Sequence, residues 1–262
     1  MLKLNTIILL IFFDFLLIIG VSQGAQETKE EVKKKFSATT SFSAVASSGN
    51  AKEFTFSLDT TNKFVFDASE LNLNVAAILS QSDGEKTSNL YNGYIKYNRN
   101  IRQKSYLSGL ISYESNTLAG FSSRYSLSWG VGHYVVKSKK TELQVEGGVG
   151  GVMEYILPKE GSQISPGSDS SATGKDKFLL SRLFVKAAFA ISPSATFSQE
   201  AQFLFNMKRA QDARIYADSA LTVKIVKHIA LQMGLKIKYD NQPVPGYVKT
   251  DIITLSTIVI SF

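Results

Sequence analysis

The chain has 262 residues, of which 44% are hydrophobic and 19% charged, with 5 prolines and a formal net charge of +7. This length and composition suit one large β domain, since all-β barrels commonly reach this size as a single unit. The sequence has no cysteine, which excludes disulfides, thiolate metal sites and a lipid anchor on cysteine. The lysines are scattered rather than grouped, and this argues against a nucleic-acid partner.

The first residues have the organisation of a secretory signal peptide. Lys3 supplies a positive charge, an apolar run follows over 7–19, and small residues follow that run. A transmembrane helix would need about 20 apolar residues, whereas this run is shorter and is interrupted by an aspartate. We therefore expect a signal peptide at 1–24 and a charged periplasmic segment at 25–35.

From Phe36 onward the pattern shows strand-like segments separated by polar breaks, without a long helical period. About twelve strands are expected, an even number as in bacterial single-chain barrels. They are Phe36–Ser48, Lys52–Thr60, Phe64–Ser80, Ser88–Arg99, Lys104–Ser115, Ser122–Lys137, Thr141–Leu157, Lys177–Ser192, Ala195–Met207, Ala213–Lys227, Ile229–Asp240 and Val248–Phe262. Most exceed the soluble mode of about five to six residues and reach the roughly nine to eleven that cross a bilayer.

The connections between these segments alternate in length. Short breaks are expected at Thr61-Asn62, Ile101-Arg102, Ser138-Lys139, Pro193 and Lys227-His228, and longer ones at Gln81–Thr87, Asn116–Phe121, Pro158–Asp176, Lys208–Asp212 and Asn241–Tyr247. Outer-membrane barrels have short periplasmic turns and longer extracellular loops. The alternation therefore predicts an all-β, transmembrane, antiparallel up-and-down β-barrel over 36–262.

The last segment is rich in β-branched residues and carries no charge after Asp251. Ile258, Ile260 and Phe262 share one face of it. An apolar strand ending on an aromatic is typical of the closing strand of outer-membrane barrels, so these three residues are expected to form the assembly signal. The alternative from this stretch alone is a buried last strand of a soluble β protein.

Six short stretches follow one another along the chain: Ser48-Gly49-Asn50, Ser112–Asn116, Gly130–Tyr134, Glu146–Tyr155, Tyr239–Pro243 and Lys249–Phe262. Through their order and spacing the chain shows a resemblance to the salt-induced outer-membrane proteins grouped as domain-of-unknown-function family 481. It spans most of the mature chain and is weakest at 158–176. It implies an outer-membrane barrel and no established biochemical activity.

Charged residues on the polar face of the strands are candidates for lining the lumen. They are Glu70, Lys96, Glu114, Arg124, Glu146, Glu154, Arg182, Lys186, Glu200, Arg214, Asp218, Lys224, Lys236 and Lys238. One interpretation is a charge-lined channel. The other is a mutually paired interior that braces the barrel, since ions away from water need partners. The near balance of signs favours pairing and argues against strong ion selectivity.

Other features point weakly to chemistry. Gly147–Gly151 would need a following helix to bind phosphate, but a strand pattern continues after it. His133 and His228 are the only histidines, and a lipid-modifying enzyme would need a nucleophile paired with one of them. The segment 158–176 reads as a surface loop that could bind an external partner.

We expect a monomeric protein of the bacterial outer membrane with a structural or narrow-pore role. No catalytic residue, cofactor or metal is expected. The expected partners are outer-membrane lipid, the barrel-assembly machinery and small solutes. A surface-binding protein acting through its long loops is the first alternative, and a lipid-modifying enzyme is the second.

Overall fold

The computed structural model of the chain describes residues 36–47, 52–157 and 174–262. The predicted signal peptide and the charged segment after it lie outside the described residues, as do residues 158–173 of the loop predicted at 158–176; its last two residues, Lys175 and Asp176, instead begin β8. The strands are β1 (Phe36–Ser47), β2 (Glu53–Val65), β3 (Ser69–Ser82), β4 (Glu85–Asn100), β5 (Ser105–Asn116), β6 (Phe121–Lys137), β7 (Thr141–Ile156), β8 (Lys175–Ala190), β9 (Ala195–Asn206), β10 (Ala213–Val226), β11 (Ile229–Asp240) and β12 (Thr250–Ser261).

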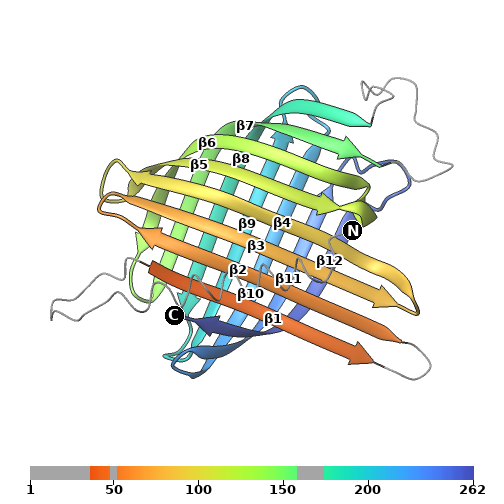
Figure 1. Cartoon of the computed structure of the whole chain (residues 1–262). Helices are drawn as coiled ribbons and strands as arrows, with labels where there is room; N and C mark the ends of the chain where they lie inside the picture. Colours follow the sequence, from red (N-terminus) through yellow and green to blue (C-terminus); the bar gives the residue numbers. More distant parts are fainter. Residues whose placement is uncertain (1–35, 48–51, 158–173) are drawn as a thin grey trace.

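Each strand pairs antiparallel with its neighbours in sequence, and β1 pairs with β12, so the sheet closes on itself (Figure 1). The prediction of an all-β, up-and-down barrel of about twelve strands is therefore confirmed. Besides the strands, the described residues contain one 3-10 turn, Thr117–Ala119. No helix among the residues described is long and apolar enough to cross a membrane.

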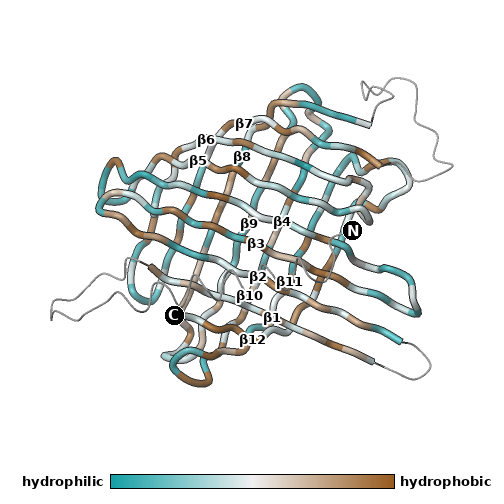
Figure 2. Tube along the Cα trace, viewed as in Figure 1, coloured by the Kyte–Doolittle hydropathy of each residue, from teal (hydrophilic) through white to brown (hydrophobic). Residues whose placement is uncertain are grey.

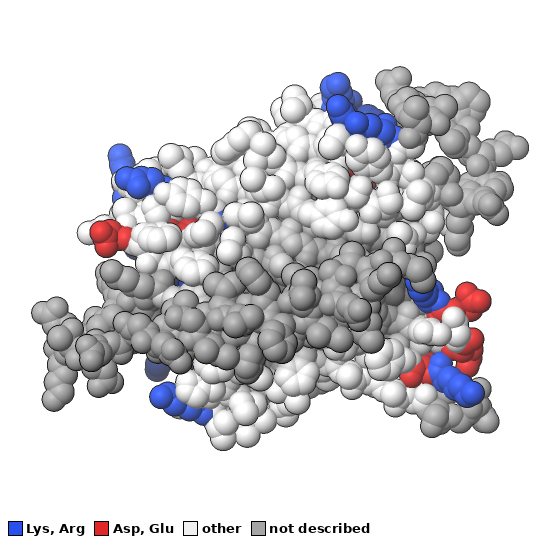
Figure 3. All heavy atoms as spheres, viewed as in Figure 1, with Lys and Arg blue, Asp and Glu red and all other residues white. Residues whose placement is uncertain are grey.

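The strands form because apolar and polar residues alternate along them, as the changing colours along each strand of Figure 2 show. On β11, Leu231 and Met233 point outward and are 51% and 66% exposed, while Gln232 and Lys236 line the interior. The apolar face is thus outside and the polar face inside, as in a membrane barrel. On the face drawn in Figure 3, charged side chains gather towards the two ends of the barrel.

Three predicted connections are wrong. The chain does not turn at Thr61-Asn62, because β2 continues to Val65 and the turn follows at 66–68. The predicted long loop at 81–87 is instead a hairpin in which only Asp83 and Gly84 lie between the strands. Both residues have positive φ, 48° and 89°, as a type I′ turn requires, and Asp-Gly is a preferred sequence for that turn. The third is the predicted long connection between β5 and β6, which spans only 117–120 and is no longer than the short turns at 101–104 and 191–194. The connections at 207–212 and 241–249 are longer than the turns at 138–140 and 227–228, as predicted.

The seam between β1 and β12 is short. Thr39–Phe42 pair with Ile258–Ser261, and the main chains of Ala38 and Phe262 exchange hydrogen bonds of 3.0 and 3.4 Å. Among the described residues, β1 beyond Phe42 pairs with β2 alone. By contrast, β11 and β12 pair from Ile229 to Tyr239. The barrel is therefore closed by its shortest ladder.

Candidate functional site in the lumen

Side chains from every strand surround a cavity of about 700 Å³ inside the barrel. On one wall, Lys186, Glu200, Asp218 and Lys236 occupy directly paired positions of β8, β9, β10 and β11, and we call these four residues the charged belt. The Lys186–Glu200 and Lys236–Asp218 ion pairs measure 3.1 and 3.2 Å, and their side chains are 30–49% exposed. Water therefore reaches this part of the lumen.

A dry cluster surrounds Glu146 on β7, whose side chain is 1% exposed. Arg182 Nη1 donates to Glu146 Oε2 at 2.8 Å, and Lys96 Nζ forms an ion pair with Oε1. Tyr106 OH donates to Oε1 at 2.6 Å, and Gln144 Nε2 donates to the same oxygen at 2.8 Å. Two cations and two neutral donors thus satisfy one buried carboxylate, which is the condition for burying such a charge.

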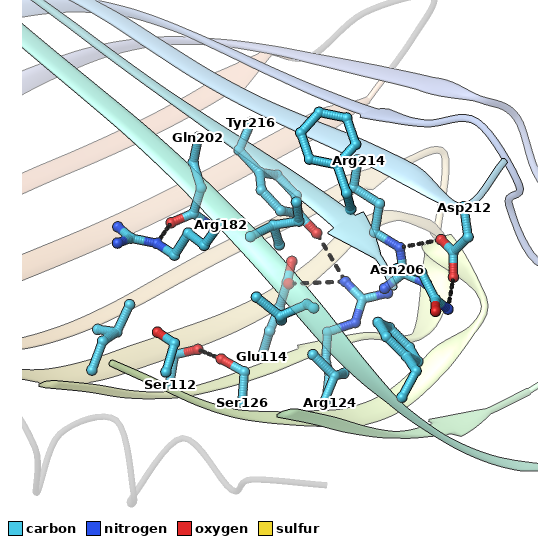
Figure 4. Close-up of a pocket in the computed structure, with 17 residues that line it drawn as sticks. Ser112, Glu114, Arg124, Ser126, Arg182, Gln202, Asn206, Asp212, Arg214 and Tyr216 are labelled. Atoms are coloured by element: carbon cyan, nitrogen blue, oxygen red, sulfur yellow. Dashed lines mark hydrogen bonds and ion pairs between the residues drawn. The ribbon is translucent and has the colours of Figure 1, made fainter. Parts of the chain in front are cut away.

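A second cluster surrounds Glu154, near the long-loop end of β7. Arg214 forms a bidentate pair with it, with N–O distances of 2.9 and 3.0 Å. Arg124 Nε donates to Glu154 Oε2 at 2.7 Å. Arg214 Nε also lies 3.1 Å from Asp212 Oδ1, and Asn206 Nδ2 donates to Asp212 Oδ2 at 2.9 Å (Figure 4). This network ties β6, β7, β9 and β10 together at one end of the lumen.

Two contacts of this second network cross the interior. Lys238 Nζ on β11 lies 2.5 Å from Glu114 Oε1 on β5. Arg124 Nη1 on β6 donates to Tyr216 OH on β10 at 3.0 Å, as Figure 4 shows, and also pairs with Glu114 at 3.3 Å. The lumen is therefore partly closed by cross-braces towards its long-loop end.

Beside these braces lies a smaller cavity of about 70 Å³. Val152, Phe178 and Leu180 form an apolar cluster on its wall, and Leu204 packs against them. The Arg214 guanidinium lies 5.2 Å from the centre of the Phe178 ring, a cation–π distance. The braced end is thus packed with apolar and paired charged side chains, while the larger cavity stays wet.

The predicted lumen residues fall into these groups. Lys96, Glu146 and Arg182 meet in the Glu146 cluster. Glu114, Arg124, Glu154, Arg214 and Lys238 meet in the second network. Lys186, Glu200, Asp218 and Lys236 form the charged belt. Glu70 lines the large cavity and pairs with Lys63 at 2.6 Å. Lys224 is exposed at the short-turn end of β10 and lines neither cavity.

Sequence reasoning missed several lumen residues. Tyr106 and Tyr216 lie in phase with Glu114 and Asp218 on their strands, so the two-residue period already placed them inward. Tyrosine is uncharged, so a charge pattern alone does not single these two residues out. The other missed residues are Asp59, Lys63, Gln144, Asn206, Asp212 and Asp240.

The residues predicted for assembly lie at the seam. Ile258 and Phe262 are 40% and 47% exposed, and Ile258 and Ile260 pair with Phe42 and Thr40 of β1. The Phe262 ring stacks on His228, with ring centres 5.6 Å apart.

The histidines and the glycine run bear on the alternative chemistries. His133 faces outward, with Nδ1 2.9 Å from Ser105 Oγ, and His228 Nδ1 lies 2.8 Å from the Ser261 carbonyl oxygen. No carboxylate in the described part of the chain bonds to either histidine. Gly147–Gly151 lies inside β7, so no helix N-terminus follows it.

The fold and the polar lumen define a β-barrel of the outer-membrane type. The chain belongs to the family described as "Protein of unknown function, DUF481", whose model matches residues 40–262. No curated protein matches the chain.

Several solved barrels are similar in fold. An outer membrane channel from Pseudomonas putida F1 is 11% identical with a TM-score of 0.48, and the match covers 90% of this chain and 100% of that one. The translocator domain of the autotransporter NalP from Neisseria meningitidis is 12% identical with a TM-score of 0.46, covering 98% and 97%. The NanC porin is 9% identical with a TM-score of 0.45, covering 86% and 97%. We draw no argument about fold or function from likeness at these TM-scores.

Proposed function

We propose that the barrel is a narrow passage for small polar solutes across the bacterial outer membrane. The observation that carries this proposal is the cavity of about 700 Å³, which every strand lines and whose charged belt is solvent-exposed. A purely structural barrel of this size could fill its lumen with side chains. Here the paired clusters fill only part of the lumen and leave this cavity beside the charged belt.

The same geometry sets what would pass. The charged belt offers both signs, with Lys186 and Lys236 flanking Glu200 and Asp218, so the wall favours neither cations nor anions strongly. The cross-brace between Lys238 and Glu114 narrows the long-loop end. A small polar or zwitterionic solute fits such a passage better than a large or strongly charged one.

Conductance of the refolded protein in planar bilayers tests the proposal. We expect stepwise openings of small amplitude and weak ion selectivity. The variant Lys236→Glu should shift the reversal potential towards cation selectivity, because this side chain lines the wet wall. Lys140→Glu, in the exposed turn between β6 and β7, is the matched control and should not. A protein that folds in the bilayer but gives no openings would leave a structural role instead.

A further inference from the structure

Among the residues described, strands β1 and β12 pair no further than Phe42 and Ile258, and the unpaired stretch beyond these residues, which we call the parting of the seam, lies at membrane depth. If the ladder continued past Phe42 and Ile258 in the same register, Ala44 would face Ser256 and Val45 would face Leu255. In the described residues these positions pair only with β2 and β11. The two strands lie side by side near the carboxyl end and run apart beyond it in Figure 1.

The neighbouring strand fixes the level of this parting. Ser256 pairs with Met233 on β11, and Ile252 pairs with Ile237. Met233 and Ile252 point outward and are 66% and 65% exposed, so both belong to the apolar band of the barrel. Unpaired backbone is not tolerated facing lipid, but it occurs at membrane depth where it lines a water-filled cavity. The parted edges of β1 and β12 meet that condition because they border the lumen.

The side chains at the parting suit an apolar chain. On the outer face its borders are small or weakly polar, with Ala44 and Ala46 on β1 and Thr254 and Ser256 on β12, all exposed. On the inner side, Leu255 lines the large cavity. An alkyl chain crossing here would therefore meet little steric obstruction and an apolar inner border.

Charged groups lie just inside. Leu255 pairs with Gly234, two residues before Lys236, whose Nζ is 3.2 Å from Asp218 Oδ2 in the charged belt. Ile78, on the β3 wall, lines the same cavity. The interior next to the parting therefore offers an apolar surface for a tail and solvated charges for a polar head.

We infer that the parted seam is a lateral portal through which single-chain amphiphiles pass between the lumen and the adjacent membrane. This goes beyond a passage for polar solutes, which would enter and leave through the two mouths. The ligand class is a molecule with one alkyl or aryl part and a small polar head.

Thiol pairs test the geometry, because the chain has no cysteine of its own. The pair Thr40→Cys/Ile260→Cys lies in the closed part of the seam and should form a disulfide on oxidation. The pair Ala44→Cys/Ser256→Cys lies at the parting and should not. Equal oxidation of the two pairs in lipid vesicles would overturn the portal.

Photolabelling tests the passage. A fatty acid with a diazirine in its alkyl chain, dissolved in vesicles holding the folded protein, should label lumen residues Ile78 and Leu255 as well as the outer residues Trp129 and Met233. Bridging Ala44→Cys and Ser256→Cys with a long bismaleimide should abolish the lumen labels and leave the outer labels unchanged. Absence of lumen labels in the unaltered protein, or their persistence after bridging, would overturn the inference.

Discussion

Lys238 Nζ on β11 lies 2.5 Å from Glu114 Oε1 on β5, so this ion pair spans the lumen between strands on opposite sides of the barrel. Its side chains are 21% and 17% exposed, which leaves them partly desolvated. Lys238→Met should remove one brace and leave Glu114 with Arg124 alone. We expect a larger single-channel conductance and a loss of about 1–3 kcal/mol in the free energy of unfolding. Lys104→Met, in an exposed turn, is the control and should change neither.

The Glu146 cluster makes the sharpest stability prediction. Glu146→Gln keeps the side-chain shape but leaves Lys96 and Arg182, which are 13% and 9% exposed, without the carboxylate that both of them contact. The free energy of unfolding should fall by about 3–5 kcal/mol, measured by urea titration in lipid vesicles. Glu85→Gln, in the exposed β3–β4 hairpin, should stay within about 0.5 kcal/mol of the parent. An unchanged Glu146→Gln variant would mean that water solvates this cluster after all.

Gly132 makes room for a ring. Tyr106 is 1% exposed and pairs with Gly132 across β5 and β6, and a Cβ at Gly132 would lie 2.0 Å from Tyr106 Cζ. Gly132→Ala should therefore displace the Tyr106 ring and break its hydrogen bond to Glu146. The free energy of unfolding should fall by about 1–3 kcal/mol. Gly151→Ala is the control, since a Cβ there meets nothing within 4 Å. The double variant Gly132→Ala/Tyr106→Ala should relieve the clash, and its failure to do so would point to backbone strain instead.

Ile258 tests whether the outer face meets lipid. Ile258→Arg should lower the free energy of unfolding by about 2–4 kcal/mol if the residue lies near the bilayer midplane, and by less towards the interface. Asn92→Arg places the same side chain in the wet lumen and should lower the free energy of unfolding far less. Folding yields in vesicles, compared by heat-modifiability on gels, give the measurement. Equal behaviour of the two variants would contradict the assignment of faces.

Orientation is testable by thiol labelling of intact cells. Val248→Cys, in the exposed connection between β11 and β12, should react with a membrane-impermeant maleimide. Ser138→Cys, in the short turn between β6 and β7, should react only after permeabilisation. The reverse pattern would place the short turns outside the cell.

Much of the fold was predictable because each strand of a barrel alternates apolar and polar residues with a period of two. Leu231, Met233, Gln232 and Lys236 alternate so regularly that β11 is found with its observed ends. The Asp83-Gly84 turn could also be predicted, because Asp-Gly is a preferred dipeptide in tight hairpins. The polar residues around it suggested a longer loop instead.

The lumen was less predictable. Period alone assigns Glu114 and Lys238 to the inside, but 124 residues separate them. Their contact depends on the shift of each strand relative to its neighbours in the closed barrel, and no local sequence pattern predicts that shift. The same holds for the parted seam, because the β-branched sequence of β12 suits a paired strand along its whole length.

The cross-braces have a mechanical consequence. They tie β5 and β6 to β10 and β11 through rigid charged contacts, so that part of the tube resists flattening. The seam between β1 and β12 has only a short ladder and no such strut among the residues described. Lateral pressure from the membrane would therefore not deform the tube evenly. The strain would concentrate along the seam between β1 and β12, which would bend while the braced strands keep their arrangement.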